Sequence, residues 1–421
     1  MQKNNPFYNK ITIRQNEETY DLLLGVVNKI LFDYSNHHLS NKKTLKRSLK
    51  NLIVNKLRFI FHVKSKFSSK SKNVIISNAY VDLKVNETTS LLPPWMYSLK
   101  KDTCLSMQVV SAIKKIDKEV EKESVKLLLS SNFIGLMSIY EEQFLKLLKE
   151  KNVRALVFAN DLGFYENLSL KIAKKSEISS FVYLHGLPAR YNNIDDNRAD
   201  YLIVWGQGIK NLYVASGVSE EKILTLPHPI YSNYEQTKLE SNFDNVLVLS
   251  KAISATPCIS TELILPDRST ILLYLELVKE NLKKLGVVKA SLRLHPSEDP
   301  DFYDKNMPDE FYSIEKQTKN ESLLKATLVV GPTSTMLLDT IKAGKNYILF
   351  DPVTDGLTLE GAPLVAPFTG DSFIKLSNDF VEMKQNIENP EININFKKLN
   401  DFFAVNESDS KRIEKIIFPV N

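Results

Sequence analysis

The chain has 421 residues, of which 43% are hydrophobic and 25% are charged, as in ordinary globular proteins. A chain of this length is too long for a single core, so two domains are expected. The net charge is only +5, the polar amino-terminus is no signal peptide, and no apolar run reaches the roughly 18 residues that span a bilayer, so we expect a cytoplasmic protein.

Residues 1–72 are expected to form a basic amphipathic extension. The stretch from Lys42 to Lys72 contains eleven Lys or Arg residues and no acid, with Leu, Ile and Phe residues interleaved among them. Such a stretch can bind an anionic membrane surface, which predicts a peripheral contact at the inner face of the cell membrane. The alternative is a pair of surface helices whose charges are simply solvated. Nucleic acid is not an expected partner, because no nucleic-acid-binding motif accompanies the charge.

After residue 72, short apolar strands alternate with helical patterns, which is typical of a parallel, doubly wound sheet. The first half has predicted strands at 73–77, 153–159, 180–184 and 201–205, and predicted helices at 104–128, 133–150, 166–175 and 207–216. A polar segment at 231–243 interrupts the pattern. The second half has predicted strands at 245–250, 287–294, 327–331 and 346–350, and predicted helices at 269–285, 334–344, 371–388 and 408–416.

We therefore predict an α/β protein with two Rossmann-like domains facing a cleft. The extension covers residues 1–72, the first Rossmann-like domain covers 73–238, and the second covers 239–421. In open α/β sheets, ligands bind beyond the carboxyl ends of the strands. The residues that follow each predicted strand are therefore the candidates for chemistry.

Arg293 and His295 lie at the end of the strand predicted at 287–294, and Pro296 stops that strand. Because side chains alternate along a strand, Arg293 and His295 project to the same face. A guanidinium fork can bind phosphate with two hydrogen bonds, and an imidazole can add another contact. The structural alternative is an ion pair between Arg293 and Glu298, with a histidine that caps a turn.

Thr333, Ser334 and Thr335 follow the strand predicted at 327–331 and precede a predicted helix. Their hydroxyls and the N–H groups at the helix start suit a nucleotide phosphate. Asp339, about one turn into the helix, is within reach of a ribose, and carboxylates often accept ribose hydroxyls. Ser and Thr are also preferred helix caps, so a purely structural role is always available. With Arg293 and His295, these residues predict a nucleotide-dependent enzyme.

Two residues of the first half are candidates for a general base. Asp161 follows the strand predicted at 153–159, and His185 follows the strand predicted at 180–184. An inverting sugar transfer needs a base that takes the proton of the acceptor hydroxyl. The structural alternatives are a helix cap or loop turn for Asp161, and a histidine at a tight turn before Gly186 for His185.

Several well-known motifs are absent from the sequence. It contains no Gly-x-Gly-x-x-Gly, no Walker phosphate loop and no Gly-x-Ser-x-Gly elbow, which argues against redox dinucleotides, ATP hydrolysis and serine hydrolysis. Cys104 and Cys258 fit no metal-ligand spacing, and Asp195-Asp196 lies in a predicted loop. We therefore expect no required metal ion and no organic cofactor.

In this order, the motifs resemble those of bacterial two-Rossmann-domain (B-fold, or GT-B) glycosyltransferases of surface polysaccharide synthesis. His295-Pro296 and Ser334-Thr335 match the His-Pro and Ser-Ser/Thr motifs with which sialyltransferases of this fold bind cytidine monophosphate (CMP). Asn160-Asp161-Leu162-Gly163 partly matches the acidic motif that supplies their base, with an extra residue before the glycine. The resemblance covers roughly residues 150–350. Transferases of 3-deoxy-octulosonate (Kdo) in capsule synthesis, and polyol-phosphate polymerases of teichoic acid synthesis, share parts of the pattern.

The resemblance implies transfer of an acidic ulosonic sugar (sialic, pseudaminic or legionaminic type, or Kdo) from its CMP donor to a glycan or lipid-linked glycan acceptor. The first domain would bind the acceptor and the second the donor. The expected catalytic residues are Asp161, His185 and His295, and on the resemblance Asp161 is preferred over His185 as the base. Alternatives are a phosphotransferase that uses a polyol linked to cytidine diphosphate (CDP), for which a histidine base is expected, a sugar-nucleotide 2-epimerase, or an inactive scaffold subunit of capsule synthesis.

Overall fold

The computed structural model of the protein describes residues 73–419, apart from positions 86, 97–100, 105, 121–130, 162, 189, 192–197, 252–267, 297, 299, 308–309 and 353–363. The basic amphipathic extension predicted for residues 1–72 lies outside the described residues. So do Asp195, Asp196 and Cys258, so the predictions that fall on them stay predictions.

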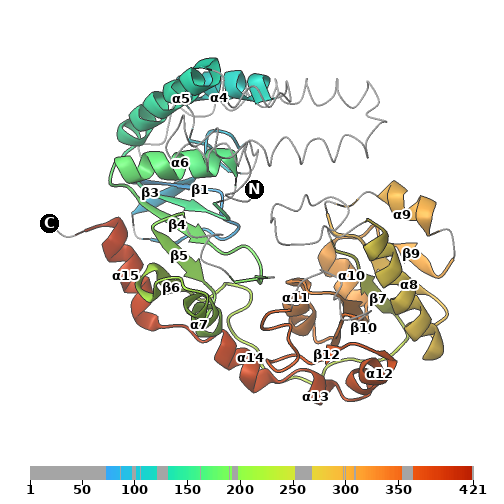
Figure 1. Cartoon of the computed structure of the whole chain (residues 1–421). Coiled ribbons are helices and arrows are strands. Elements are labelled where there is room, and N and C mark those ends of the chain that lie inside the picture. The colour runs from blue at the N-terminus through green and yellow to red at the C-terminus, as the bar shows by residue number, and fades with distance from the viewer. Residues whose placement is uncertain are drawn as a thin grey trace.

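The first of two parallel six-stranded sheets has the strand order β2-β1-β3-β4-β5-β6. Its strands are β1 (Asn73–Ser77), β2 (Thr88–Leu91), β3 (Val153–Phe158), β4 (Ser179–Tyr183), β5 (Tyr201–Val204) and β6 (Ile223–Thr225). The accompanying helices are α4 (Met107–Val120), α5 (Ser131–Glu150), α6 (Phe164–Lys175) and α7 (Gln207–Ala215), with a 3-10 turn, η2 (Glu220–Lys222). Helices α4 and α5 lie side by side at one end of this domain, and α7 lies near its other end (Figure 1).

This sheet forms because its central strands are apolar on both faces. In β1, Val74, Ile75 and Ile76 are each at most 2% exposed, and β3 and β4 end in equally buried runs. Parallel strands covered by helices on both faces need such continuous apolar runs, rich in branched side chains. The polar side chains of Asn78, Asp161 and His185 lie beyond the carboxyl ends of these strands.

The second sheet has the order β12-β11-β10-β7-β8-β9, and all its pairings are parallel. Its strands are β7 (Val246–Leu249), β8 (Ala290–Arg293), β9 (Tyr312–Ile314), β10 (Leu328–Gly331), β11 (Tyr347–Phe350) and β12 (Leu376–Ser377). The helices are α8 (Arg268–Lys284), α9 (Pro300–Asn306), α10 (Lys319–Lys325), α11 (Met336–Lys342), α12 (Phe380–Glu388) and α13 (Pro390–Asn393). The start of α10 is fixed by a capping box between Thr318 and Glu321.

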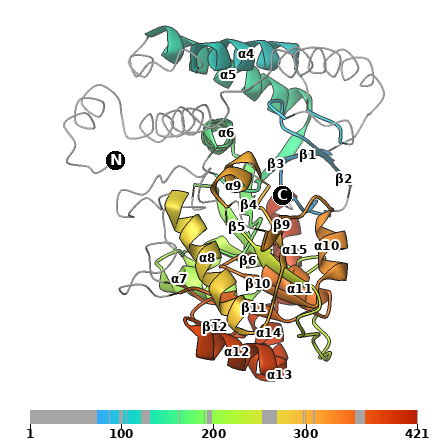
Figure 2. The same ribbon diagram turned by 90° about the vertical axis from the view of Figure 1, so that its right-hand side faces the viewer.

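The two faces of the second sheet belong to different hydrophobic clusters. On β7, Val246 and Val248 pack in a cluster with α8, whereas Leu247 and Leu249 pack in a cluster that continues into the first domain. This division follows from the alternation of side chains along a strand. Helix α8 covers the first of these faces (Figure 2). The face that carries Leu247 and Leu249 links the two domains through apolar contacts.

The carboxyl-terminal helices return to the first domain. The segment with α14 (Phe396–Phe402) and α15 (Glu407–Ile417) runs back from the second sheet, and α15 lies beside β6 (Figure 1). The Asp409 carboxylate accepts hydrogen bonds from the Thr225 backbone N–H (2.7 Å) and hydroxyl (2.9 Å). A Cβ atom at Gly206 would lie 2.4 Å from Phe403 Cα, so only glycine fits there. The predicted boundary at 238/239 assigns α14 and α15 to the second domain, whereas α15 packs beside β6 of the first sheet.

The predicted fold class is confirmed: the chain is an α/β protein with two Rossmann-like domains, each built on a parallel six-stranded sheet. Among the residues that the structure describes, no helix is both long enough and apolar enough to cross a membrane.

Candidate active site

Four neighbouring strands of the second sheet are followed by polar side chains along one edge. Strands β11, β10, β7 and β8 are consecutive in the sheet, and the residues beyond their carboxyl ends are Asp351, Thr333, Lys251 and His295. The Lys251 ammonium donates a short hydrogen bond to Thr333 Oγ1. The charge of Lys251 also acts on His295, and the charge of Asp351 acts on Lys251. The fold therefore brings two predicted nucleotide-binding residues, His295 and Thr333, to either side of a lysine.

Lys251 is a residue that the sequence analysis missed. Burial lowers the pKa of its ammonium from 10.5 to about 7, and the nearby Asp351 carboxylate opposes this shift only in part. At neutral pH its charge is therefore sensitive to what binds beside it. Only its position in the sequence could have identified Lys251 as a candidate, since it stands two residues after a strand that is buried on both faces.

His295 sits in a turn at the end of β8. Its backbone N–H donates to Ser250 Oγ (2.9 Å), and its carbonyl oxygen accepts the Glu298 N–H (2.9 Å), so the turn that contains Pro296 is fixed at both ends. Partial burial lowers the pKa of the His295 ring, the charge of Lys251 adds to this effect, and Glu298 opposes it. The imidazole is therefore neutral at neutral pH and can donate one N–H to an anion.

Arg293 makes hydrogen bonds within the second domain. Its Nη1 atom donates to the Gln317 carbonyl oxygen and to Ser322 Oγ, both at 3.0 Å. Ser322 in turn donates to Glu315 (2.7 Å). These bonds tie β8 to the loop after β9 and to α10. The use of Arg293 for phosphate binding stays a prediction, whereas its structural use is visible.

The three hydroxyl residues after β10 are half-buried and have different partners. Ser334 Oγ accepts the Met336 backbone N–H (3.2 Å), which supports the first turn of α11. Thr335 Oγ1 accepts a backbone N–H from the other domain, that of Leu187 (2.9 Å). Thr333 accepts from Lys251. The hydroxyl row is therefore already organised as a set of acceptors, and a hydroxyl group can donate a hydrogen bond as well as accept one.

Asp339 lies on α11 as predicted, one turn beyond the hydroxyl row. One of its carboxylate oxygens, Oδ1, accepts both the Tyr231 hydroxyl (3.0 Å) and the Lys319 ammonium (2.8 Å). Tyr231 belongs to the segment that connects the two sheets, and its ring stacks on His228 at 4.4 Å. Asp339 therefore also anchors the connecting segment, and its use for a ribose stays a prediction.

In the first domain, His185 is exposed just beyond β4. Its Nδ1 atom lies 2.8 Å from the Ala159 carbonyl oxygen. A carbonyl oxygen can only accept, so Nδ1 carries the proton and Nε2 keeps a lone pair in the neutral ring. A base oriented through its other nitrogen in this way is a common arrangement in catalytic histidines.

Asn78 fixes the backbone of Ala159, whose carbonyl oxygen is the hydrogen-bond partner of His185. Its side-chain oxygen accepts the Ala159 N–H (3.0 Å), and its side-chain N–H₂ donates to Glu166 Oε1 (2.8 Å). Burial raises the pKa of Glu166, and the Trp95 indole N–H also donates to it (3.1 Å). Asn78 was also missed in the sequence, because its partners lie more than eighty residues away.

Asp161 has no exposed surface. Its oxygens accept the Arg198 backbone N–H (2.6 Å) and the Arg198 guanidinium (3.2 Å). A carboxylate enclosed and bonded in this way is in a poor position to reach an acceptor hydroxyl. The geometry is that of a structural residue that holds the segment before β5.

Replacing Asp161 with Asn is expected to lower the free energy of unfolding by about 2–4 kcal/mol, because it removes the carboxylate from a buried, charge-assisted pair. The transition is to be followed by circular dichroism in thermal and denaturant unfolding. Unchanged stability together with abolished turnover would instead identify Asp161 as the base, against the structural role.

The two candidate regions meet across the domains. The Leu187 N–H that donates to Thr335 Oγ1 is two residues after His185, and a Cβ atom at Gly186 would lie 3.0 Å from the same oxygen. The loop after β4 and the hydroxyl row after β10 are therefore in direct contact. The candidate base of the first domain, His185, and the candidate phosphate-binding residues after β10 therefore belong to two loops that contact each other.

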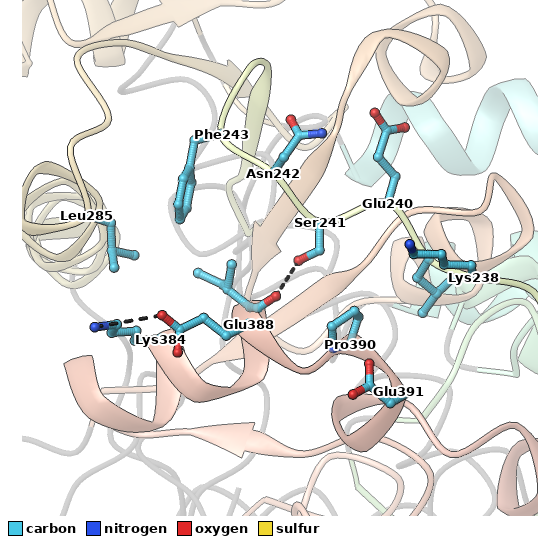
Figure 3. Close-up of a pocket in the computed structure, with 12 residues that line it drawn as sticks. Lys238, Glu240, Ser241, Asn242, Phe243, Leu285, Lys384, Glu388, Pro390 and Glu391 are labelled. Atoms are coloured by element: carbon cyan, nitrogen blue, oxygen red, sulfur yellow. Dashed lines mark hydrogen bonds and ion pairs between the residues drawn. The ribbon is translucent and has the colours of Figure 1, made fainter.

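A separate surface pocket of about 490 Å³ lies away from these two loops. It is lined by residues 238–243 of the connecting segment, by Leu285, and by residues of α12 and α13 (Figure 3). Ser241 Oγ donates to the Ile387 carbonyl oxygen (2.7 Å), and Lys384 pairs with Glu388 (3.7 Å). Over the whole of the described residues, no group of three or more His, Cys, Asp or Glu side chains could hold a metal ion.

No protein-family model matches the chain, and no curated protein matches it significantly. Among solved structures, it is similar to UDP-GlcNAc 2-epimerase from Neisseria meningitidis bound to UDP-GlcNAc, with 9% identity, coverage of 82% of this chain and 96% of that chain, and a TM-score of 0.41. It is also similar to the lipopolysaccharide outer core galactosyltransferase WaaB in its apo form (12% identity, 82% and 99% coverage, TM-score 0.40). A third is the wall teichoic acid polymerase TagF (13% identity, 88% and 95% coverage, TM-score 0.39). Similarity at this level carries no argument about activity, and the fold assignment rests on the two sheets.

Proposed function

We propose that this protein is a glycosyltransferase that moves an acidic ulosonic sugar from its CMP donor to a surface glycan acceptor. The observation that carries the proposal is the hydrogen bond between the Leu187 N–H and Thr335 Oγ1. It joins the loop of the candidate base His185 to the hydroxyl row of the second sheet. A reaction between an acceptor held by one domain and a nucleotide held by the other requires such a junction.

On this proposal, the second domain binds the nucleotide. The neutral His295 ring and the hydroxyls of Thr333 and Ser334 donate hydrogen bonds to the phosphate of the donor. Their contacts strengthen as the bond between the anomeric carbon and the phosphate oxygen breaks, because negative charge then gathers on the departing CMP. Asp339 is the candidate for the ribose, since it lies one turn further along α11.

We assign the base to His185 in place of Asp161. The acceptor hydroxyl oxygen attacks the anomeric carbon of the sugar, the bond to the phosphate oxygen breaks, and CMP leaves with the bonding electron pair. Nε2 of His185 takes the acceptor proton, while Nδ1–H stays bonded to the Ala159 carbonyl oxygen. The buried Asp161, which is bonded to Arg198, has no part in this step.

One observation favours a second candidate function, transfer of a polyol phosphate from a CDP-polyol. In teichoic-acid enzymes with a similar motif pattern, a histidine after this strand is the expected base, and the exposure of His185 agrees with that pattern. The acceptor hydroxyl would then attack phosphorus instead of carbon. Both reactions release CMP, so the chemical group that is added to the acceptor separates them.

The nucleotide preference tests the proposal directly. A ligand at a hundredfold excess over its dissociation constant stabilises the fold by about 2.7 kcal/mol. CMP is therefore expected to raise the melting temperature of the full chain in a thermal shift assay, and UMP, UDP and GDP are expected to raise it much less. Ser334→Ala should reduce the CMP shift. An equal or larger shift with UDP would contradict the assignment of a cytidine donor.

A further inference from the structure

We propose that Lys251 binds the phosphate that leaves with the nucleotide, and that it takes up a proton from solvent as the phosphate arrives. The site is defined by the position and contacts of Lys251. The identity of the anion as the phosphate of a CMP donor rests on the proposed function. Inorganic pyrophosphate, which carries no nucleoside, therefore serves as an independent probe.

The position of Lys251 supports phosphate binding. Its strand, β7, lies between β10 and β8, so its side chain stands between the Thr333 hydroxyl and His295. Two other described cations near this edge hold other segments: Arg293 is bonded to the loop before α10, and Lys319 is paired with Asp339. Of these three described cations, Lys251 is the one placed in the middle of the row.

The charges around Lys251 explain the proton uptake. Asp351 at the end of β11 favours the ammonium form, but burial outweighs this effect and the pKa falls to about 7. On the other side, His295 titrates next to Lys251 and is itself influenced by Glu298. Asp351 and His295 are therefore two titratable groups whose charges are coupled to that of Lys251. A phosphate dianion adds negative potential at this point, which raises the pKa of Lys251 and draws in a proton.

The affinity for phosphate should therefore fall as the pH rises above 7. Below pH 7 the ammonium is already charged, so phosphate binds without proton uptake by Lys251. Above pH 7 each binding event must first add a proton, so the affinity falls about tenfold per pH unit. The phosphate of CMP adds little to this dependence above pH 8, because the second pKa of a phosphate monoester is about 6.

The test is isothermal titration calorimetry of the full chain with CMP at pH 8.5. Runs in two buffers of different ionisation enthalpy give the number of protons taken up. The wild type should take up about one proton for each bound anion. Lys251→Arg keeps a permanent charge, so it should bind with almost no uptake and with a weaker dependence on pH. Lys325→Arg, a change at an exposed lysine near the end of α10, is the matched control and should behave like the wild type.

Competitive acetylation with acetic anhydride, followed by mass spectrometry, measures the protonation of Lys251 in the absence of a nucleotide. The reactivity of Lys251 should rise at a pH well below the ordinary lysine pKa of 10.5, and pyrophosphate should protect it. Equal proton uptake by the wild type and Lys251→Arg, or a Lys251 that pyrophosphate does not protect, would overturn the proposal. Protection by pyrophosphate without any binding of CMP would leave Lys251 as an anion site and would instead contradict the proposed function.

Discussion

Replacing His185 with Gln is expected to lower the turnover number by a factor of about 10²–10⁴, the usual contribution of a positioned general base. Glutamine preserves much of the shape and can still donate to the Ala159 carbonyl oxygen, but it has no basic nitrogen to take the acceptor proton. The affinity for CMP should stay within about twofold of the wild type, because the nucleotide contacts lie in the second domain. The measurement combines steady-state CMP release with calorimetric CMP binding.

The companion variant is Asp161→Asn, compared at a temperature where both variants remain folded. If His185 is the base, Asp161→Asn should retain most of its turnover, since its role is to hold Arg198. The reverse ranking, with His185→Gln active and Asp161→Asn inactive, would return the base to Asp161.

Replacing Lys251 with Met is expected to stabilise the protein by about 3 kcal/mol at pH 7 while it weakens nucleotide binding. In the unfolded chain Lys251 has its ordinary pKa of 10.5, and in the folded chain burial lowers this pKa to about 7. Between these values the unfolded state binds more protons than the folded state, so the lowered pKa costs the fold about 4 kcal/mol at pH 7. Loss of the bond to Thr333 offsets about 1 kcal/mol of the gain.

The stabilisation gained by Lys251→Met should decrease as the pH rises. A lysine with a lowered pKa in the folded state costs most at and below pH 7, and the cost disappears as the pH approaches 10.5. Denaturant unfolding of Lys251→Met and wild type at several pH values should therefore show curves that converge as the pH rises. A variant that is less stable than the wild type at pH 7 would mean that Lys251 serves the fold rather than a ligand.

The core strands could be predicted from the sequence because each is a short apolar run between polar loops. Strands such as β1, β3, β7, β10 and β11 carry that signal in their own residues. Three of the four edge strands, β2, β9 and β12, do not: β2 reads Thr-Thr-Ser-Leu and is only half-buried, and β12 has two residues. Such strands are defined by the neighbour with which they pair, which the local sequence does not show.

The same distinction separates the site residues. His295, Ser334 and Thr335 stand in recognisable motifs, so they could be identified before their surroundings were known. Lys251 has no motif, and its lowered pKa arises from burial at an edge that β8, β10 and β11 share. Asp161 carries a motif, but its burial depends on Arg198, 37 residues away. Non-local packing therefore decides between a binding residue and a structural one.

The most direct test of the central claim is the mass that the full-length protein adds to an acceptor. Wild type and His185→Gln are to be incubated with a lipid-linked glycan acceptor and, in separate reactions, with CMP-ulosonic acids, CDP-polyols and UDP-GlcNAc, with product masses read by mass spectrometry. We predict that the wild type adds one ulosonic acid to the acceptor, releases CMP, and does so far faster than His185→Gln. Addition of a polyol phosphate, epimerisation of UDP-GlcNAc, or no reaction with any CMP-ulosonic acid would contradict the account.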